Sequence, residues 1–360
     1  MQTEIPFLFL RGGTSRGLYF RALDLPSDRA TLSRVLRAAL GSGHPLNIDG
    51  LGGGASVTTK VAILSRGAED ISFFFAQVDP MRAEVDYKPS CFNILSGVGP
   101  AALEMRLWPA NMGQTRVPIH AVNTGAQVEA VVQTPDGRVT YDGAQAIDGV
   151  PGTAAPVALT FRGIAGSSCG AMLPTGRARE LIDGVEVTLL DVAMPMMIAR
   201  AADLGLTGGE SVAEIDANTP LLARIEAMRL EAGRRMMGGA DVSASVTPKI
   251  GLISAPVAGG NLRARYLTPW AGHPSMAVSG AQCLSACAVL PGSVAEGLAV
   301  LPASSPAQMQ IEHPMGLLPV LLDFTRNGGG VMIHGAGILR TARLLARGVV
   351  MVPKGVWAGM

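Results

Sequence analysis

The chain repeats part of its own sequence, and no other feature constrains its fold as strongly. Three pairs of similar segments occur in the same order along the chain: Arg21–Leu25 with Arg200–Leu204, Val57–Ser65 with Val246–Ser254, and Cys91–Gly97 with His273–Ser279. A duplication within 360 residues predicts two similar domains, over residues 1–182 and 183–360, with the C-terminal segment able to pack back on the first domain. Two copies around a pseudo-twofold axis would place the active site between them, with Cys91 roughly opposite His273.

Composition limits the partners and the location that we predict. The net charge is +1, from 29 basic and 28 acidic residues dispersed along the chain, so neither nucleic acid nor a membrane surface is expected as a partner. No apolar stretch approaches the roughly 18 residues of a membrane span. Four cysteines without CxxC or disulfide-framework spacing indicate a reduced, cytoplasmic protein. A small anionic carboxylate remains the expected ligand, and a homodimer is a possible assembly.

Periodicity predicts a chain built mostly of strands, with one nearly all-apolar helix in each half. Helices are predicted over Ser27–Leu40, Asn93–Arg106, Pro220–Met237 and His273–Val289. Pro100 requires a kink or a break in the second of these. An all-apolar helix must be covered on every side, so we expect a sheet wrapped around it. The predicted fold class is α+β, with two pseudo-symmetric lobes, each a mostly antiparallel sheet around a central helix.

Two residues of the first copy are candidates for proton transfer. Cys91 follows a turn-rich stretch and precedes an apolar helix, whose N-terminus favours the thiolate; a buried structural cysteine is the alternative. Lys60 lies in an otherwise uncharged strand, so its amine either reaches solvent or faces a polar cleft, where it could act as a general base. Its counterpart Lys249 leaves a shared architectural role open. Cys283 and Cys287, one helical turn apart, are expected in the core.

The segment Arg11–Gly17 concentrates groups that bind carboxylates. It combines a glycine turn with two hydroxyls and two guanidinium groups, whereas the equivalent turn of the second copy, Asp191–Pro195, has neither glycines nor such donors. It matches neither a P-loop nor a dinucleotide fingerprint. His273 could be structural, but its place in the repeat equally favours substrate binding. The five histidines form no metal-ligand pattern, so no metal site is predicted.

These segments resemble the PrpF family of isomerases, which have the diaminopimelate epimerase fold. The matching stretches are Arg11–Gly17, Ile48–Gly50, Thr58–Ala62, Asp86–Gly99, Ile147–Gly152, Leu173–Gly176 and the region around His273. The resemblance implies two epimerase-like lobes, no cofactor, and a catalytic pair formed by Lys60 as base and Cys91 as acid or orienting group. The substrate-binding residues that it implies are Arg11, Thr14, Ser15, Asp49, Ser56, Thr59, Asn93, His273 and Ser275.

The implied reaction is a keto–enol tautomerisation or a 1,3-allylic proton shift of an unsaturated di- or tricarboxylate, with 4-oxalomesaconate of gallate degradation as the expected substrate. Two residues depart from the family pattern: Phe92 stands where the family usually has glycine, and Arg16 where it usually has lysine. A phenylalanine can close a carboxylate pocket. The alternatives are therefore a methylaconitate- or aconitate-type isomerase of the same family, or a catalytically silent homologue that only binds carboxylates.

Overall fold

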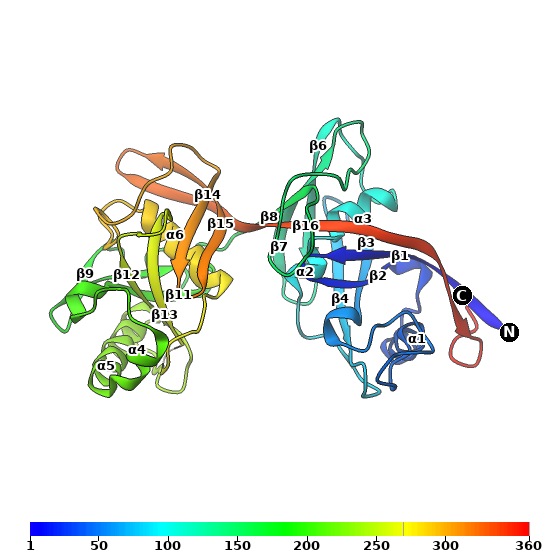
Figure 1. Cartoon of the computed structure of the whole chain (residues 1–360), viewed down its shortest axis with the longest axis horizontal. Coiled ribbons are helices and arrows are strands. Elements are labelled where there is room, and N and C mark those ends of the chain that lie inside the picture. The colour runs from blue at the N-terminus through cyan, green and yellow to red at the C-terminus, as the bar shows by residue number, and fades with distance from the viewer. Residues whose placement is uncertain (269, 360) are drawn as a thin grey trace. The chain divides into compact units, whose positions relative to one another are not determined.

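A computed structural model describes residues 1–268 and 270–359 and divides the chain into two compact units (Figure 1). Unit 1 comprises Met1–Leu159 and Leu339–Met360, and unit 2 comprises Thr160–Ile338. Unit 1 is therefore discontinuous in sequence, because the end of the chain returns to it.

Two strands, β8 (Pro156–Arg162) and β16 (Gly330–Pro353), run from one unit into the other. The predicted domain boundary after residue 182 lies further along the chain, within unit 2. The last part of β16 pairs in antiparallel fashion with the first strand, from Gln2 opposite Pro353 to Gly12 opposite Ala342. Both chain ends consequently belong to unit 1, as Figure 1 shows.

Unit 1 is a mostly antiparallel sheet with helices on its two faces. The strands pair in the order β1–β2–β3–β4–β6–β7–β8, with β5 on β4, and the pairs β2/β3 and β4/β6 are parallel. The strands are β1 (Gln2–Gly12), β2 (Ser15–Arg21), β3 (Lys60–Arg66), β4 (Ile71–Val78), β5 (Val85–Asp86), β6 (Gly113–Ala121) and β7 (Ala126–Thr134). The helices are α1 (Arg29–Leu40), α2 (Phe92–Leu95) and α3 (Val98–Glu104), with short 3₁₀ turns η1 (Ala22–Asp24) and η2 (Ser56–Thr58).

Helix α1 covers one face of this sheet. It begins where the side chain of Asp28 accepts a 2.8 Å hydrogen bond from the Thr31 N–H, and it ends at Gly41, whose φ of 68° is left-handed. Its apolar residues Leu32, Val35, Leu36, Ala39 and Leu40 are buried against Leu18 and Phe20 of β2 and against alternate residues of the neighbouring strands. On the other face of the sheet, α2 contacts β1, β2 and β3, and α3 contacts β3 and β7.

The helix predicted over Asn93–Arg106 is broken into α2 and α3. The break falls at Ser96 and Gly97, before Pro100, which occupies the first turn of α3. Proline is tolerated there because the first-turn N–H groups of a helix have no intrahelical partner. A Cβ at Gly97 would meet the hydroxyl of Tyr19, so close packing also requires glycine at the break.

Unit 2 repeats this arrangement. Its strands pair in the order β9–β10–β11–β12–β13–β14–β15–β16, and β11/β12 and β13/β14 are the parallel pairs. The new strands are β9 (Glu180–Ile182), β10 (Val185–Asp191), β11 (Pro195–Arg200), β12 (Lys249–Ser254), β13 (Leu262–Leu267), β14 (Ala307–His313) and β15 (Gly316–Asn327). The helices are α4 (Val212–Ala217), α5 (Thr219–Met236) and α6 (Val278–Val289), and η3 spans Ala201–Leu204.

Both units are mostly antiparallel sheets around a central helix, which is divided into α2 and α3 in unit 1, and this confirms the predicted α+β fold class with two similar lobes. Lys60 begins β3 and Lys249 begins β12, and each strand is parallel to the strand that ends at Arg21 or Arg200. A 3₁₀ turn follows both arginines. In unit 2 the central helix α6 is continuous and buried almost all round.

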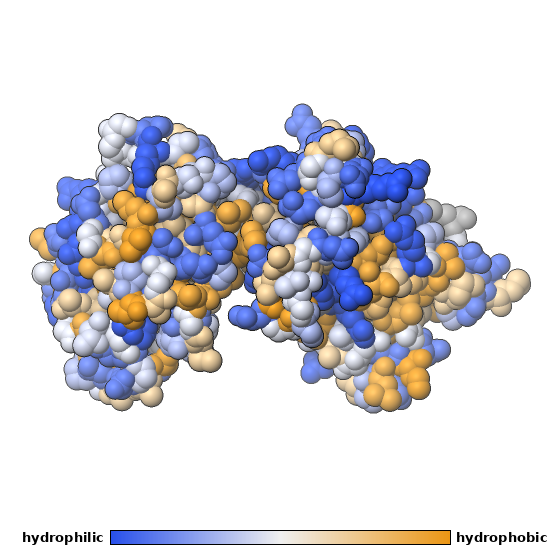
Figure 2. Space-filling view, turned by 45° about the horizontal axis from the view of Figure 1, so that its top comes forward, coloured by the Kyte–Doolittle hydropathy of each residue, from blue (hydrophilic) through white to orange (hydrophobic). Residues whose placement is uncertain are grey.

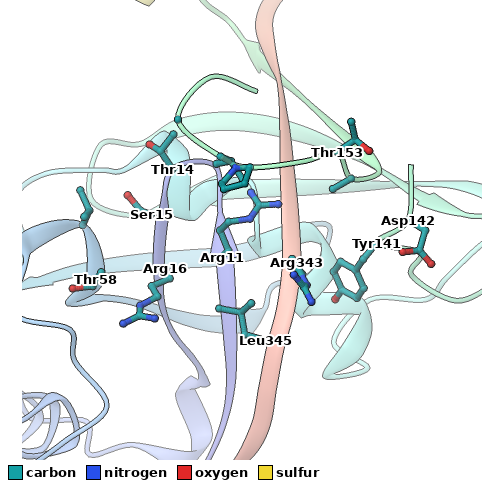
Figure 3. A pocket seen from close by; sticks show the side chains of 15 residues that line it. Arg11, Thr14, Ser15, Arg16, Thr58, Tyr141, Asp142, Thr153, Arg343 and Leu345 are labelled. Atoms are coloured by element: carbon teal, nitrogen blue, oxygen red, sulfur yellow. The ribbon is translucent and has the colours of Figure 1, made fainter. Parts of the chain in front are cut away.

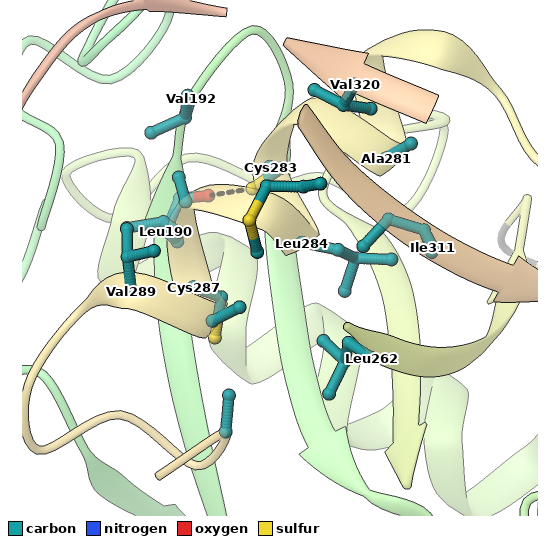
Figure 4. Packing of buried hydrophobic residues seen from close by; sticks show 14 of the residues in the cluster. Leu190, Val192, Leu262, Ala281, Cys283, Leu284, Cys287, Val289, Ile311 and Val320 are labelled. Atoms are coloured by element: carbon teal, nitrogen blue, oxygen red, sulfur yellow. Dashed lines mark hydrogen bonds between the residues drawn. The ribbon is translucent and has the colours of Figure 1, made fainter. Parts of the chain in front are cut away.

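The core of unit 2 surrounds α6, as Figure 4 shows. Cys283 and Cys287 are fully buried there, and the Cys283 thiol donates a 3.7 Å hydrogen bond to the Leu190 carbonyl. Burial raises the pKa of Cys287 to about 11 and that of Cys283 well above its ordinary value. Both cysteines are therefore core residues, as predicted.

The outer surface is mixed in character. On the face shown in Figure 2, hydrophilic and hydrophobic residues are interspersed over both units. Among the described residues, no helix has the length and apolar character needed to cross a membrane.

Candidate active site

Lys60 is the first residue of β3, and its amine is held by a neighbouring strand. It pairs with Gly17 of β2 on one side and with Gln77 of β4 on the other. Its Nζ donates a 2.6 Å hydrogen bond to Gln77 Oε1 and lies 5.4 Å from the ring centroid of Phe75. The side chain is half-buried. Among the described residues, the Lys60 amine thus has one hydrogen-bond partner, the Gln77 amide, and lies against one aromatic ring, that of Phe75.

Gln77 is a functional candidate that sequence reasoning missed. Its Nε2 lies 3.1 Å from the Ser56 carbonyl and 3.2 Å from the Val78 carbonyl, so the amide nitrogen faces carbonyl oxygens and Oε1 is left for Lys60. Only the register of β3 against β4 identifies this partner, because Gln77 is far from Lys60 in sequence.

Cys91 is the N-cap residue of α2. Its backbone is extended, with φ −136° and ψ 106°, and its carbonyl accepts a 2.8 Å hydrogen bond from the Leu95 N–H. The buried Tyr19 donates a 2.7 Å hydrogen bond to the Ile94 carbonyl, and burial raises its pKa well above the ordinary value. Tyr19 thus bonds β2 to the first turn of α2, which begins directly after Cys91. Phe92 is an ordinary helical residue with 44% of its surface exposed.

Lys60 and Cys91 belong to the same face of the unit 1 sheet. Successive strand residues point to opposite faces. Leu18 of β2 faces α1, so Gly17 and Tyr19 face α2. Lys60 pairs with Gly17 and its amine lies over Phe75, on the face away from α1. The two predicted catalytic residues are therefore brought to one face at one end of the sheet.

The hairpin turn between β1 and β2 packs directly on α2. Asn93 donates a 2.9 Å hydrogen bond from Nδ2 to Thr14 Oγ1. A Cβ at Gly12 or Gly13 would collide with Asn93, and Gly13 has a left-handed φ of 51°. Ser15 is buried, and none of the described residues forms a hydrogen bond with its hydroxyl.

A pocket of about 660 Å³ opens beside the same turn (Figure 3). Arg11, Arg16 and Arg343 line it, together with Thr14, Ser15, Thr58, Tyr141, Asp142, Gly149, Val150, Pro151 and Thr153 among others. Burial, and then the neighbouring Arg343, lower the pKa of Arg11. The Nε of Arg16 is buried without a partner among the described residues. Such a cluster of guanidinium groups is suited to an anion.

The structure separates the predicted binding residues into two groups. Phe9 packs on the α1 face, and Arg11 and Arg16 lie on that same face, with Arg16 5.5 Å from the Phe9 ring. They are therefore on the face opposite Lys60, while Thr14 and Ser15 lie at the turn between the two faces. One nitrogen of Arg11, Nη1, is committed to Gly13 and Thr341.

The remaining predicted residues of unit 1 are arranged around the start of β3. Asp49 and Ser56 are exposed, and Ser56 contributes its carbonyl to Gln77. Thr59 is fully buried and donates a 2.7 Å hydrogen bond to the Val78 carbonyl. The loop that precedes η2, with glycines at positions 50, 52, 53 and 54, is held by the buried Asn47, which sequence reasoning missed. The Asn47 side chain forms hydrogen bonds with the backbone of Gly41, His44, Pro80 and Gly54.

In unit 2, the prediction that His273 opens the central helix is wrong. Helix α6 begins at Val278, and the N–H of His273 instead donates a 2.7 Å hydrogen bond to the Tyr266 carbonyl. Pro274 accounts for this, because the residue before a proline avoids the helical conformation. Ser275 donates its N–H to His273 Nδ1 at 3.0 Å, and its hydroxyl lies 3.3 Å from Nδ1 of His313. His313 is a further residue that sequence reasoning missed.

Comparison with known proteins identifies the family. The PrpF protein family profile matches residues 2–353. The chain belongs to the PrpF family. It is 45% identical to a 4-oxalomesaconate tautomerase of Pseudomonas putida, covering 99% of both chains, and 44% identical to a (4E)-oxalomesaconate Delta-isomerase of Novosphingobium sp., covering 96% of this chain and 97% of that one. A crystal structure of a methylitaconate-delta-isomerase superposes with a TM-score of 0.84 at 31% identity, over 99% of this chain and 97% of the other.

These comparisons confirm the family resemblance, the fold and the prediction that this PrpF chain is an isomerase. They do not bear on the individual roles of Lys60, Cys91 or the binding residues. Among residues 1–268 and 270–359, no three His, Cys, Asp or Glu side chains are grouped so that they could hold a metal ion.

Proposed function

We propose that this protein interconverts the keto and enol forms of 4-oxalomesaconate without a cofactor. The observation that carries the proposal is the placement of Lys60 and Cys91 on one face and at one end of the unit 1 sheet, in a PrpF chain whose relatives include a 4-oxalomesaconate tautomerase. The reaction moves one proton within a conjugated acid and involves no net oxidation. A base and an acid within reach of the substrate are sufficient for it.

In the proposed mechanism, Lys60 acts as the base that removes a proton from the carbon next to the carbonyl group. The electron pair delocalises into a dienolate, which takes a proton at another atom of the conjugated system, with Cys91 as the acid or orienting group. When Cys91 is the donor, its thiolate and the Lys60 ammonium regain their starting forms by proton exchange with solvent. Gln77 supports this assignment because its neutral Oε1 accepts a hydrogen bond from the amine in either protonation state. The hydroxyls of Thr14 and Ser15 and the amide of Asn93 are candidate donors to the developing oxyanion.

The arginine-lined pocket supports an anionic substrate. Arg11, Arg16 and Arg343 make no ion pair with a carboxylate among the described residues, although Asp142 also lines the pocket. We propose that this pocket attracts or holds carboxylate groups beside the β1–β2 turn, on the α1 face of the unit 1 sheet. Proton transfer then takes place on the opposite face, where Lys60 lies.

Related substrates are the second candidate. The structural similarity to a methylitaconate isomerase favours an allylic shift in a methylaconitate- or aconitate-like acid as the alternative activity. A silent carboxylate-binding homologue is the remaining alternative, because Phe92 stands at the start of α2, next to Cys91. The role in gallate degradation, the cytoplasmic location and a homodimeric assembly form part of the same proposal.

The test is the ultraviolet absorbance change when the purified protein meets each form of 4-oxalomesaconate. We expect rapid interconversion by the wild type and a loss of about 10²–10⁴-fold in kcat for Lys60→Ala and for Cys91→Ala. Lys249→Ala is the matched control, since Lys249 begins the equivalent strand of unit 2; it should keep activity within a few fold.

Two outcomes would contradict the proposal. An active Lys60→Ala variant would exclude Lys60 as the base. A wild type that binds but does not convert 4-oxalomesaconate would exclude that substrate, and turnover of aconitate-like acids would then distinguish another isomerase from a silent homologue.

A further inference from the structure

Ser275 connects two imidazole rings that lie far apart in sequence. Its backbone N–H donates a 3.0 Å hydrogen bond to Nδ1 of His273, and its hydroxyl lies 3.3 Å from Nδ1 of His313. His273 precedes α6, whereas His313 ends β14 at the turn into β15. Both rings are half-buried. Ser275 is thus in contact with the Nδ1 atom of His273 and with the Nδ1 atom of His313.

The donors around the two rings determine where their protons lie. A backbone N–H can only donate, so Nδ1 of His273 must accept from Ser275. Nδ1 of His313 must likewise accept from the Met315 N–H, which is 3.2 Å away. The hydroxyl of Ser275 can then only donate its hydrogen to Nδ1 of His313. In a neutral imidazole one nitrogen accepts and the other carries the hydrogen. Each ring therefore carries its hydrogen on Nε2.

The charged surroundings favour the same neutral state for His313. Burial, then His273, then Arg265 lower its pKa below the ordinary value. The carboxylate of Glu312 points away from His313, because successive residues of a strand face opposite sides of the sheet, and it is directed to the N–H groups of Val257, Ala258 and Gly260. A proton added at Nδ1 of either ring would also meet the hydrogen atoms of its present donors.

We propose that Ser275 holds His273 and His313 as neutral imidazoles that present Nε2–H donors to the oxygen atoms of a carboxylate bound by unit 2, and that His313 is a binding residue for that carboxylate. None of the described residues is hydrogen-bonded to either Nε2. A neutral N–H donor can bind a carboxylate or enolate oxygen without protonating it, which suits a reaction that passes through a dienolate. The identity of the ligand rests on the proposed function, whereas the tautomer does not.

The first experiment measures the tautomer directly. Long-range ¹H–¹⁵N correlation spectra of the ¹⁵N-histidine-labelled full chain at pH 7.5 distinguish Nε2–H, Nδ1–H and imidazolium rings, with His273→Gln and His313→Gln variants to assign the signals. We expect both rings in the Nε2–H form, and Ser275→Ala should shift the His313 signal. An Nδ1–H or imidazolium form of either ring in the wild type would overturn the proposal, whether or not the enzyme turns over 4-oxalomesaconate.

The second experiment separates binding from architecture with two variants of His313. In His313→Gln the amide N–H₂ can occupy the place of Nε2, whereas in His313→Asn the amide oxygen occupies the place of Nδ1 and still accepts from Ser275 and Met315. Calorimetric titration with tricarballylate, a saturated tricarboxylate, measures binding without turnover. If Nε2–H contacts the ligand, Kd should rise by about tenfold or more for His313→Asn and by less than about threefold for His313→Gln.

The reverse ranking, or equal affinities for both variants and the wild type, would show that His313 serves only to hold Ser275 and would overturn the proposal. So would a wild type that binds no tricarballylate. Far-ultraviolet circular dichroism melting curves check that both variants are folded. Because binding is measured with an unreactive acid, a failure of the tautomerase proposal alone would leave this result unchanged.

Discussion

Lys60 and Lys249 show how equivalent residues acquire different surroundings. Each begins a strand that is parallel to the preceding strand of its unit. Lys60 is bonded to Gln77, whereas the pKa of Lys249 is lowered by burial and by nearby Arg229. The repeat predicts that both lysines have the same backbone position. It does not predict their side-chain partners, because those come from other strands.

Replacing Gln77 should impair catalysis more than binding. Gln77→Leu removes the acceptor that positions Nζ of Lys60, and small misplacements of a reacting group are costly. We expect kcat to fall roughly 10- to 100-fold with KM changed less than about threefold. The control is Gln133→Leu, a residue of β7 bonded to exposed Gln114, and steady-state kinetics measure both. Unchanged kcat in Gln77→Leu would contradict a positioning role.

Phe92 should control substrate size and have little influence on stability. It is 44% exposed in a regular helical conformation, so Phe92→Gly should lower the free energy of unfolding by no more than about 1 kcal/mol. Space opened beside Cys91 should raise kcat/KM for branched tricarboxylates about tenfold relative to 4-oxalomesaconate. Competition assays with a methylaconitate-like acid measure the ratio; a ratio equal to that of the wild type would exclude Phe92 as the determinant.

At the scale of elements, the sequence pattern locates helices well but misplaces some of their ends. The helix predicted over Pro220–Met237 is observed as α5, because its amphipathic face and its Asn218 cap are local features. The late start of α6 follows from Pro274 together with the bond from the His273 N–H to the Tyr266 carbonyl, and the position of the break between α2 and α3 depends on the distant Tyr19 hydroxyl. Local periodicity carries no information about either contact.

Helix α5 should depend on one buried arginine. Arg229 is fully buried, forms two hydrogen bonds with Glu226, and donates to the carbonyls of Val242, Ser245 and Thr247 before β12. Arg229→Met leaves these carbonyls and Glu226 without their partner, so we expect a loss of about 3–5 kcal/mol in urea denaturation. Arg234→Met, on the exposed side of the same helix, should cost less than about 1 kcal/mol. Equal losses would contradict this prediction.

Unit 2 should be acid-sensitive through Glu312. Burial acts to raise the pKa of this carboxylate, but backbone N–H donors, those of Val257 first, hold it below the ordinary value. When the pKa of a carboxyl group is lower in the folded than in the unfolded state, its ionised form stabilises the fold. This stability is fully present at a pH above the unfolded-state pKa and is lost as the pH falls through the folded-state pKa. The wild type should therefore lose stability below roughly pH 4, the ordinary range of a glutamate.

Glu312→Gln tests this assignment by urea denaturation across pH 3–7, a range that brackets the ordinary glutamate value. The variant should be about 2 kcal/mol less stable at neutral pH and should show a shallower acid dependence. Glu296→Gln, whose carboxylate side chain is 62% exposed, is the control. An acid dependence identical to that of the wild type would assign the acid sensitivity to other groups.

At the scale of the whole molecule, the return of the chain completes unit 1. The last part of β16 supplies the strand that pairs with β1, and Val350 and Val352 are buried in the core against α1. A chain that ends at Ile338 should therefore lose cooperative folding of unit 1 and the amide protection of β1, measured by hydrogen exchange. A chain that ends at Trp357 should retain both. Full protection of β1 in the shorter chain would show that unit 1 is stable without its last strand.

The sequence by itself determined the duplication, the family, the fold class and the identity of the proposed proton-transfer residues, because similar segments and strand alternation are local properties. Only the tertiary structure decided that Lys60 meets Gln77, that Arg11 lies on the face opposite Lys60, and that Ser275 links His273 with His313. These relations follow from strand register, in which a shift of one residue exchanges the two faces of a sheet. Register depends on the apolar patterns of both paired strands and on the turns that join them, so the order of residues within one strand alone does not encode it.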